Sequence, residues 1–323
     1  MADPARTASA ESGSPTLVVT SFGATDRGRV RPTNEDHFLI ADLAKAMHVR
    51  QTSLEEPRAR FGEQRGHLFL VADGMGGHRA GEHASALAVT LIEQFALNTF
   101  RWFMPLTAVH ADDVVTDFQA AVEQADATIV EAATKRAELR GMGTTLTLAY
   151  HYGAELLVIH VGDSRAYLLR DETLRQITQD HTIVAEMVRR GELDTAEARR
   201  HRLRHVITNV VGGAQSGVQA DAHSLELRVG DELLICSDGL TEMLSHDEIT
   251  QILRGEPHLE AACTRLISLA NERGGHDNIT AIVVRFSASP TTTAERLDNG
   301  SAWSEVAREL RPPVTDAAEP RSR

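Results

Sequence analysis

The sequence predicts an α+β fold, a four-layer α-β-β-α sandwich in which two packed antiparallel β-sheets are flanked by helices on both outer faces. Short apolar runs, typical of buried strands, recur between residues 16 and 286. Hairpin-length connections between them outnumber helical crossovers, which favours antiparallel pairing. Longer amphipathic stretches interrupt the strands, and their apolar faces can cover the outside of two packed sheets.

Four apolar runs are the clearest strand candidates. They are HLFLVAD (67–73), TTLTLAYHY (144–152), ELLVIHVG (155–162) and ELLICSD (232–238). The segment 164–178 predicts a hairpin that turns at Asp171 and Glu172. The polar stretch 43–66 predicts a long surface loop between two strands.

Helices are expected where apolar residues recur at helical spacing. Three such stripes are Ala84, Leu87, Leu91 and Phe95; Val114, Phe118, Ala121, Val122, Ala125 and Ile129; and Leu259, Ala262, Leu266 and Ala270. Two shorter helices are expected within residues 182–215, where Gly191 can end one helix and Asp194 with Glu197 can begin the next. We call residues 182–215 the flap, because they interrupt the alternation of strands and helices.

The chain organisation expected is one folded domain, residues 16–286, between largely disordered tails at 1–15 and 287–323. The two cysteines, Cys236 and Cys263, lie in apolar stretches and read as core residues, which fits a reducing compartment. No signal-like leader and no run of about 18 apolar residues is present, so we expect a cytoplasmic protein without a membrane partner. The formal charge of −13 argues against nucleic-acid binding.

Acidic residues recur in one kind of setting, where an apolar strand is expected to deliver an aspartate to its end and a small or amide residue follows. The four pairs are Asp73-Gly74, Asp163-Ser164, Asp238-Gly239 and Asp277-Asn278. One such pair is typical of a turn. Four pairs, joined by Glu35-Asp36 after an expected early strand, indicate a shared carboxylate site. Carboxylate oxygens favour Mg²⁺ or Mn²⁺.

The histidines give no comparable signal. His78 and His83, and His201 and His205, are suitably spaced, but no HExxH or Cys-x-x-Cys pattern accompanies them. We expect surface or capping roles for all four. A cysteine-dependent phosphatase is excluded because neither cysteine has an arginine six positions later, and no GxxxxGK[ST] nucleotide loop is present.

Seven stretches together resemble the ordered motifs of the protein phosphatase 2C family of metal-dependent protein phosphatases, in its bacterial type. They are RPTNEDHF (31–38), VADGMGGHRAGEHAS (71–85), GMGTTLT (141–147), HVGDSRAYLLR (160–170), ITQDHT (177–182), LLICSDGLTEML (233–244) and GGHDNITAIVV (274–284). Their order and spacing agree with the family over roughly residues 16–286, and one such motif alone would carry little weight.

The resemblance implies a centre of two Mn²⁺ or Mg²⁺ ions. Asp73 would bridge both ions, the backbone carbonyl of Gly74 would bind one, and Asp238 and Asp277 would hold the other. The carboxylate is the natural bridge because its two oxygens can each serve a different ion.

The remaining site residues are also assigned through the resemblance. Glu35 and Asp36 would contact metal directly or through water, and which of them does so is open. Asp163 would help to bind a third, weaker cation beside Asp238. Arg31 would grip the substrate phosphate, a task suited to a planar guanidinium.

The activity implied is hydrolysis of phosphoserine and phosphothreonine in proteins by a hydroxide that bridges the two ions, with serine/threonine kinases and their substrates as partners. The alternative is a catalytically silent phosphatase-like domain that binds phosphoproteins or acts as a scaffold. Such a domain would be expected to lose metal carboxylates, and here they are retained. Met75 stands where some relatives have a histidine regarded as the general acid, so that role stays unassigned.

The flap is rich in arginine, with Arg189, Arg190, Arg199, Arg200, Arg202 and Arg204. These side chains either steer acidic phosphoproteins by complementary charge or form a solvated helical face with ion pairs inside the chain. The sequence leaves both readings open.

Overall fold

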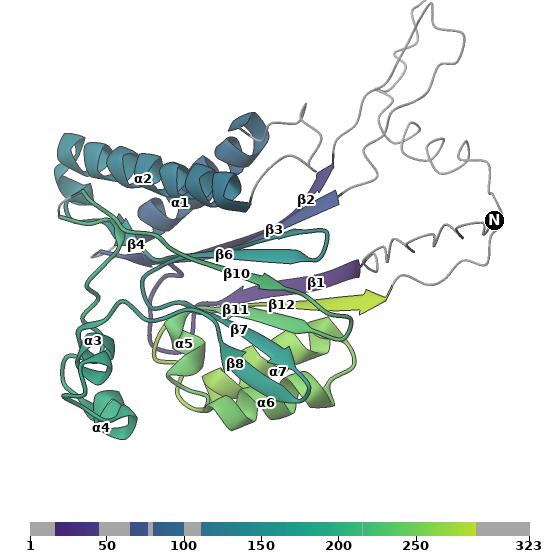
Figure 1. Ribbon diagram of the computed structural model, residues 1–323. Coiled ribbons are helices and arrows are strands. Elements are labelled where there is room, and N and C mark those ends of the chain that lie inside the picture. Colours follow the sequence, from purple (N-terminus) through teal and green to yellow (C-terminus); the bar gives the residue numbers. More distant parts are fainter. Residues whose placement is uncertain (1–16, 45–64, 77–79, 100–110, 215, 289–323) are drawn as a thin grey trace, which may run out of the picture. The chain divides into compact units, whose positions relative to one another are not determined.

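The computed structural model confirms the predicted α+β sandwich (Figure 1). Two antiparallel sheets face each other, and helices cover each outer face. The structure describes residues 17–44, 65–76, 80–99, 111–214 and 216–288. The predicted tails therefore lie outside the described residues, apart from residues 287 and 288 at the end of the last strand.

The first sheet has five strands, and all its pairings are antiparallel. In spatial order they are β1 (Leu17–Asp26), β12 (Ile279–Ala288), β11 (Glu232–Cys236), β7 (Arg165–Arg170) and β8 (Thr173–Gln176). β7 and β8 form the predicted hairpin. Asp171 and Glu172 at its turn have φ values of 48° and 64°, as a two-residue turn with the twist of the flanking strands requires.

The second sheet has seven strands. In spatial order they are β10 (Asp221–Glu226), β6 (Glu155–Val161), β5 (Leu146–Tyr152), β3 (Arg65–Met75), β4 (Gly143–Thr144) and β9 (Val211–Gly212), and β2 (Asp36–Ala44) pairs with β3. The predicted loop 43–66 falls between β2 and β3 as expected, and its residues 45–64 lie outside the described ones.

Helices cover the two outer faces as the apolar stripes predict. On the second sheet lie α1 (Ala80–Thr99) and α2 (Ala111–Lys135), and on the first lie α6 (His246–Gly255) and α7 (Leu259–Glu272) (Figure 1). Short helical turns also occur at η2 (Ala137–Leu139) and α5 (Asp238–Thr241). The stripe residues Phe118, Ile129 and Leu266 are fully buried, since these faces pack on the sheets.

The flap contains the two expected helices, α3 (Ile183–Arg189) and α4 (Thr195–Arg200). Gly191 has a φ of +73°, which only glycine adopts easily and which ends the first helix. Asp194 accepts a hydrogen bond from the Glu197 amide, and the Glu197 side chain accepts one from the Asp194 amide. This reciprocal capping box confirms the predicted helix start. That the segment acts as a flap stays a prediction.

An apolar layer also fills the space between the two sheets. Phe69 and Val71 from the second sheet meet Ile235 and Ile282 from the first, and all four are fully buried. Cys236 and Cys263 are buried and free, as expected for core residues. In the part of the chain that the structure describes, no helix is long and apolar enough to cross a membrane.

Candidate functional site

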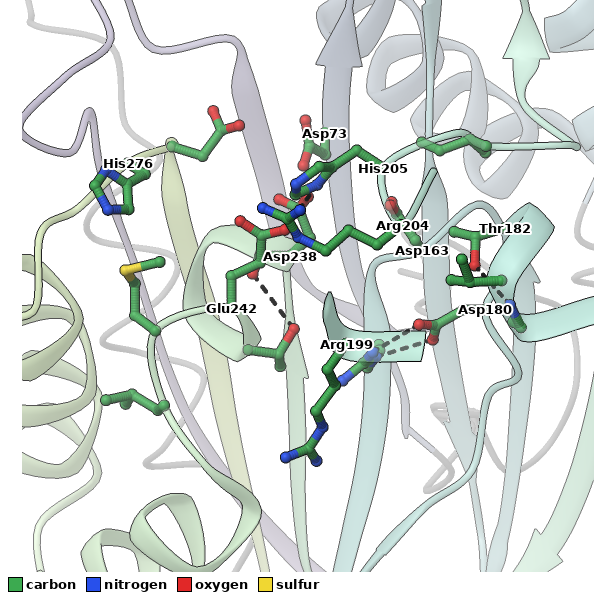
Figure 2. Close-up of a pocket in the computed structure, with 18 of the residues that line it drawn as sticks. Asp73, Asp163, Asp180, Thr182, Arg199, Arg204, His205, Asp238, Glu242 and His276 are labelled. Atoms are coloured by element: carbon green, nitrogen blue, oxygen red, sulfur yellow. Dashed lines mark hydrogen bonds and ion pairs between the residues drawn. The ribbon is translucent and has the colours of Figure 1, made fainter. Parts of the chain in front are cut away.

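Seven of the eight predicted site residues line one open cleft of about 1740 Å³ at the edge of the sandwich (Figure 2). They are Arg31, Glu35, Asp73, Gly74, Asp163, Asp238 and Asp277. The eighth, Asp36, is only 4% exposed, and it lies next to Asp73 because the two residues are paired across β2 and β3. The fold thus brings together acidic residues that are far apart in the sequence.

Asp36 is held in a defined orientation. Its Oδ2 accepts hydrogen bonds from the Ser237 hydroxyl at 2.8 Å and the Thr280 hydroxyl at 2.7 Å. Its Oδ1 is buried and has no donor among the described residues. The expected early strand is β1, which ends at Asp26, and Asp36 itself is the first residue of the next strand, β2. The chain enters the sheet at this position, and the side chain of its first strand residue is directed inward.

Asp277 differs from its predicted setting, because it precedes β12 instead of ending a strand. The neighbouring Asn278 fixes this loop. Its Nδ2 donates to the carbonyls of Arg27 and Thr33, both at 2.9 Å, and its Oδ1 accepts from the Glu35 amide at 2.8 Å. One side chain therefore joins the Asp277 loop to the segment before β2. The Asp-Asn dipeptide is the local sequence feature that accompanies this bridge.

Asp73 lies within β3, which continues to Met75. Its amide donates to the Thr145 hydroxyl at 3.0 Å, and its carbonyl accepts from the Thr145 amide and the Thr144 hydroxyl, both at 2.9 Å. These bonds immobilise the backbone that carries the carboxylate. Asp238 begins α5 two residues after the end of β11, and Asp163 lies two residues after the end of β6, so these two predicted strand-end positions are confirmed.

Glycine is required at two positions in the site because backbone passes too close for a side chain. A Cβ on Gly74 would lie 2.2 Å from the Gly81 carbonyl oxygen, and a Cβ on Gly239 would lie 2.0 Å from the Asn278 carbonyl oxygen. Both distances are far below contact distance, and both neighbours are backbone atoms.

Gly239→Ala is accordingly expected to lower the free energy of unfolding by about 1–3 kcal/mol, the usual cost of forcing an extra group into a packed site. Gly255→Ala is the matched control, because no atom lies within 4 Å of a Cβ at that helical position. Urea denaturation of both variants measures the effect. Equal stability of Gly239→Ala and the wild type would show that the close approach is relieved without cost.

Burial and mutual repulsion raise the pKa values of the carboxylates in the cleft. Burial is the largest cause of the raised pKa of Asp73 and Asp238, and nearby carboxylates add to it. Burial likewise raises the pKa of Asp36 to about 6 and that of Asp163 to about 7. The pKa of Asp73 responds to Asp36, Asp163, Asp238 and Asp277, so all five carboxylates interact.

This donor set fits hard divalent cations. Asp36 Oδ1 and Asp238 Oδ1 are buried oxygens without a hydrogen-bond donor in the described part of the chain. A cation would satisfy such oxygens and compensate the repulsion between the carboxylates. Asp73, Asp238 and Asp277 do not form a trio with ligand atoms all within 4.8 Å. A centre of two ions about 3.5–4 Å apart does not require such a compact trio, because the ligands are distributed around both ions.

Arg31 lies in the same cleft, with its Nη2 2.5 Å from Asp277 Oδ2. This hydrogen bond is the largest cause of the raised pKa of Arg31. Its side chain is 53% exposed, so the guanidinium is also accessible from solvent. The structure therefore places Arg31 where a phosphate could reach it, beside the predicted ligands.

Arg165 and Asp180 form a second ion pair in the cleft, one that the sequence did not single out. Arg165 Nε and Nη2 donate to the two carboxylate oxygens of Asp180 at 2.9 and 2.6 Å. Asp180 in turn adds to the raised pKa of Asp163. The pair anchors the segment that leads into the flap.

The structure separates the flap arginines by position. Arg190 forms an i,i+4 pair with Glu186 at 3.5 Å, as expected for a solvated helical face. Four others line the cleft and are exposed: Arg189, Arg199, Arg200 and Arg204. Arg190 thus fits a solvated helical face, and steering of acidic substrates by the cleft-lining arginines stays a prediction.

His205 and Glu242 were missed as site residues by sequence reasoning. His205 is exposed, as the surface role expected for it requires, and it also lines the cleft, where its Nδ1 lies 2.8 Å from Glu242 Oε1. Among the described residues, His205, Asp238 and Glu242 form a group whose potential ligand atoms all lie within 4.8 Å of one another. The i,i+4 spacing of Asp238 and Glu242 was the only available signal.

Comparison with known proteins finds one matching family and several related phosphatases. A family model described as Protein phosphatase 2C matches residues 46–283. The serine/threonine phosphatase Stp of Listeria innocua is 34% identical over 260 residues, which cover 80% of this chain and 93% of the relative. The serine/threonine protein phosphatase PstP of Mycobacterium tuberculosis is 35% identical over 274 residues, 83% of this chain and 45% of that longer relative.

Solved structures of serine/threonine phosphatases also match this chain. The catalytic domain of PstP in complex with two manganese ions matches with a TM-score of 0.66 and 33% identity, over 84% of this chain and 100% of that one. A serine/threonine phosphatase from Staphylococcus aureus matches with a TM-score of 0.69 and 29% identity, over 84% of this chain and 96% of that one. The chain described here belongs to the protein phosphatase 2C family.

Proposed function

We propose that the protein hydrolyses phosphoserine and phosphothreonine in other proteins with the help of two Mn²⁺ or Mg²⁺ ions. The observation that carries this proposal is the convergence of five interacting, largely buried carboxylates beside Arg31 in an open cleft. Membership of a family whose relatives are serine/threonine phosphatases supports the same substrate class.

The ions, when bound, would supply a hydroxide at neutral pH and neutralise the charge of the phosphate. Asp73 is proposed to serve both ions, the Gly74 carbonyl one of them, and Asp238 and Asp277 the other. Support comes from the raised pKa of Asp73, to which Asp238 and Asp277 both contribute. The hydrogen bonds of Thr144 and Thr145 to its backbone hold Asp73 in place.

Asp36 is proposed to contribute its free Oδ1 to the centre, and Glu35 to act from its edge. Asp36 is fixed by two hydroxyl donors and leaves one buried oxygen available. Glu35 lies close to α1, where its Oε2 fills the space that a Cβ on Gly81 would occupy. Asp163 is proposed to bind a weaker cation beside Asp238, in agreement with its contribution to the raised pKa of Asp238.

Arg31 is proposed to donate two hydrogen bonds to the phosphate of the substrate. Arg31→Ala is expected to lower kcat/KM for a phosphothreonine peptide by about 10- to 100-fold, because a hydrogen bond to a charged group contributes about 1.5–3 kcal/mol. Arg29→Ala is the matched control, since Arg29 belongs to the same segment but does not line the cleft. Unchanged kcat/KM in Arg31→Ala would remove Arg31 from the site.

The competing proposal is a phosphatase-like domain that binds phosphoproteins without hydrolysis. Release of inorganic phosphate from a phosphothreonine peptide, measured with Mn²⁺, with Mg²⁺ and with EDTA, separates the two. We expect turnover with Mn²⁺ or Mg²⁺ and none with EDTA. Absence of metal-dependent turnover above background would favour the binding domain.

We further propose that the protein acts in the cytoplasm, that residues 16–286 form its phosphatase domain, and that serine/threonine kinases and their targets are among its substrates. The two buried free cysteines support a reducing compartment. Comparison of the phosphoproteome in cells with and without the protein tests the substrate assignment. No gain of phosphoserine or phosphothreonine in any protein on removal would contradict it.

A further inference from the structure

A buried histidine connects the base of the flap to the loop that carries Asp163. His181 lies directly before the flap, and Gly162 lies directly before Asp163. The His181 amide donates to the Gly162 carbonyl at 2.7 Å, and the Gly162 amide donates to His181 Nδ1 at 3.1 Å. A single residue therefore satisfies both backbone polar groups of Gly162.

We propose that His181 is a positioning residue for the phosphatase centre. Through Gly162 its ring fixes the place of the Asp163 carboxylate, and through its backbone it holds the flap at the same point. The inference rests on the proposed function, because Asp163 is assigned there to the weaker cation.

The Gly162 amide depends on the imidazole as its acceptor. Gly162 follows the last residue of β6, so its amide lies beyond the paired residues of the second sheet. Gly162 is buried, and a buried amide needs a partner within the protein when water cannot reach it. Loss of the Nδ1 acceptor would leave this amide unsatisfied, and the loop would shift to find another partner.

Such a shift would move the Asp163 carboxylate. Asp163 is only 7% exposed, and its carboxylate bonds to the backbone amide of its own residue. The carboxylate therefore follows the backbone at residues 162 and 163, and its distance from Asp238 changes with it. Groups that orient metal ligands from behind affect metal affinity nearly as strongly as some ligands do.

Neighbouring side chains fix the ring of His181. Since Nδ1 accepts from Gly162, the ring proton lies on Nε2, which donates to Asp221 Oδ2 at 3.1 Å. The fully buried His160 packs against the ring, with centroids 4.9 Å apart. Asn209 Nδ2 lies 3.1 Å from the same Nδ1. The ring is thus held with its acceptor directed at the Gly162 amide.

The backbone of His181 joins the two ends of the flap. The Thr208 amide donates to the His181 carbonyl at 2.8 Å, and Thr182 pairs with Ile207 across the base. The flap therefore begins and ends beside the Asp163 loop. A purely structural role would need these backbone contacts but no particular ring nitrogen, so variants that separate the two nitrogens test the inference.

Two substitutions make this separation. His181→Asn places an amide oxygen near the position of Nδ1 and keeps an acceptor for Gly162, whereas His181→Gln reaches the position of Nε2 and keeps only the contact with Asp221. His151→Gln is the matched control. His151 is also buried, lies outside the cleft, and bonds through Nε2 to the Gly153 carbonyl, a contact that glutamine can retain.

The first measurement is amide hydrogen exchange at Gly162, resolved by NMR in EDTA. We expect exchange at least about 10-fold faster in His181→Gln than in the wild type, with the amides of β12 unchanged. His181→Asn and His151→Gln are expected to match the wild type. This readout needs neither bound metal nor turnover, and a general loss of stability would accelerate β12 as well.

The second measurement is the Mn²⁺ concentration that gives half-maximal hydrolysis of a phosphothreonine peptide. It is expected to rise about 10- to 100-fold in His181→Gln, with the KM for the peptide at saturating Mn²⁺ unchanged, and to stay at the wild-type value in His181→Asn. Equal behaviour of the two His181 variants in either measurement would overturn the inference. A wild type without metal-dependent hydrolysis would instead contradict the proposed function, and exchange at Gly162 would then decide the role of His181.

Discussion

Asp73→Asn is expected to reduce the turnover of a phosphothreonine peptide by at least about a thousandfold, since cations in such a centre contribute several kcal/mol to transition-state stabilisation. The amide keeps the shape of the side chain but loses the charge and one of the two oxygens that a bridging ligand needs. Steady-state kinetics at saturating Mn²⁺ measure the loss. Asp42→Asn is the control, because that carboxylate is 74% exposed at the other end of the β2–β3 pair.

The same substitution carries a second signature that a merely structural role would not produce. Burial and four neighbouring carboxylates raise the pKa of Asp73, so removing its charge relieves repulsion in the metal-free protein. Asp73→Asn is therefore expected to be more stable than the wild type in EDTA and less stabilised by Mn²⁺. Wild-type turnover in Asp73→Asn, or a lower stability in EDTA, would contradict the role of Asp73.

The metal-free protein is expected to become less stable as the pH rises. The pKa of Asp36 is raised to about 6 and that of Asp163 to about 7, both chiefly by burial. A carboxyl group whose pKa is higher in the folded than in the unfolded state stabilises the fold while it is protonated. Its contribution is full below the unfolded value near 3.8 and is lost as the pH rises through the folded values. The expected loss between about pH 5 and pH 8 is on the order of several kcal/mol.

Mn²⁺ should reverse this trend, because it binds the deprotonated carboxylates and competes with protons. The difference in Tm between Mn²⁺ and EDTA is therefore expected to grow from about pH 5 to about pH 8, and to be small in Asp73→Asn. Thermal denaturation followed by circular dichroism gives both curves. A Tm in EDTA that stays constant or rises over this interval would show that the carboxylates are not mutually destabilised.

Local features of the fold could be predicted from the sequence because a few neighbouring residues determine them. The turn at Asp171 and Glu172 and the capping box of Asp194 and Glu197 are of this kind. β10 and α6 were missed. β10 alternates half-buried and exposed residues without a strongly apolar run, and α6 has only Ile249 and Leu253 fully turned to the core. β10 is stabilised by its pairing with β6, which local spacing does not reveal. The start of α6 did carry a local signal, the capping box of Ser245 and Glu248.

The candidate site was likewise predictable only in part. The identity of the acidic residues was accessible, since strands that end in aspartate recur and the motifs resemble a family. The backbone setting of Asp36 and Asp277 was not, because Asp36 begins β2 and Asp277 precedes β12. Contacts of Ser237, Thr280 and Asn278 with these two segments determine how they are oriented. His205 escaped notice because its partners lie in α5, far along the chain.

A crystal structure of the protein soaked in Mn²⁺, with anomalous differences measured for manganese, tests the central claim most directly. We expect two strong peaks about 3.5–4 Å apart, one near each carboxylate oxygen of Asp73, with Asp238 and Asp277 coordinating one of them. A single peak that Asp73 does not contact, or no peak within coordination distance of these aspartates, would contradict a two-cation phosphatase centre.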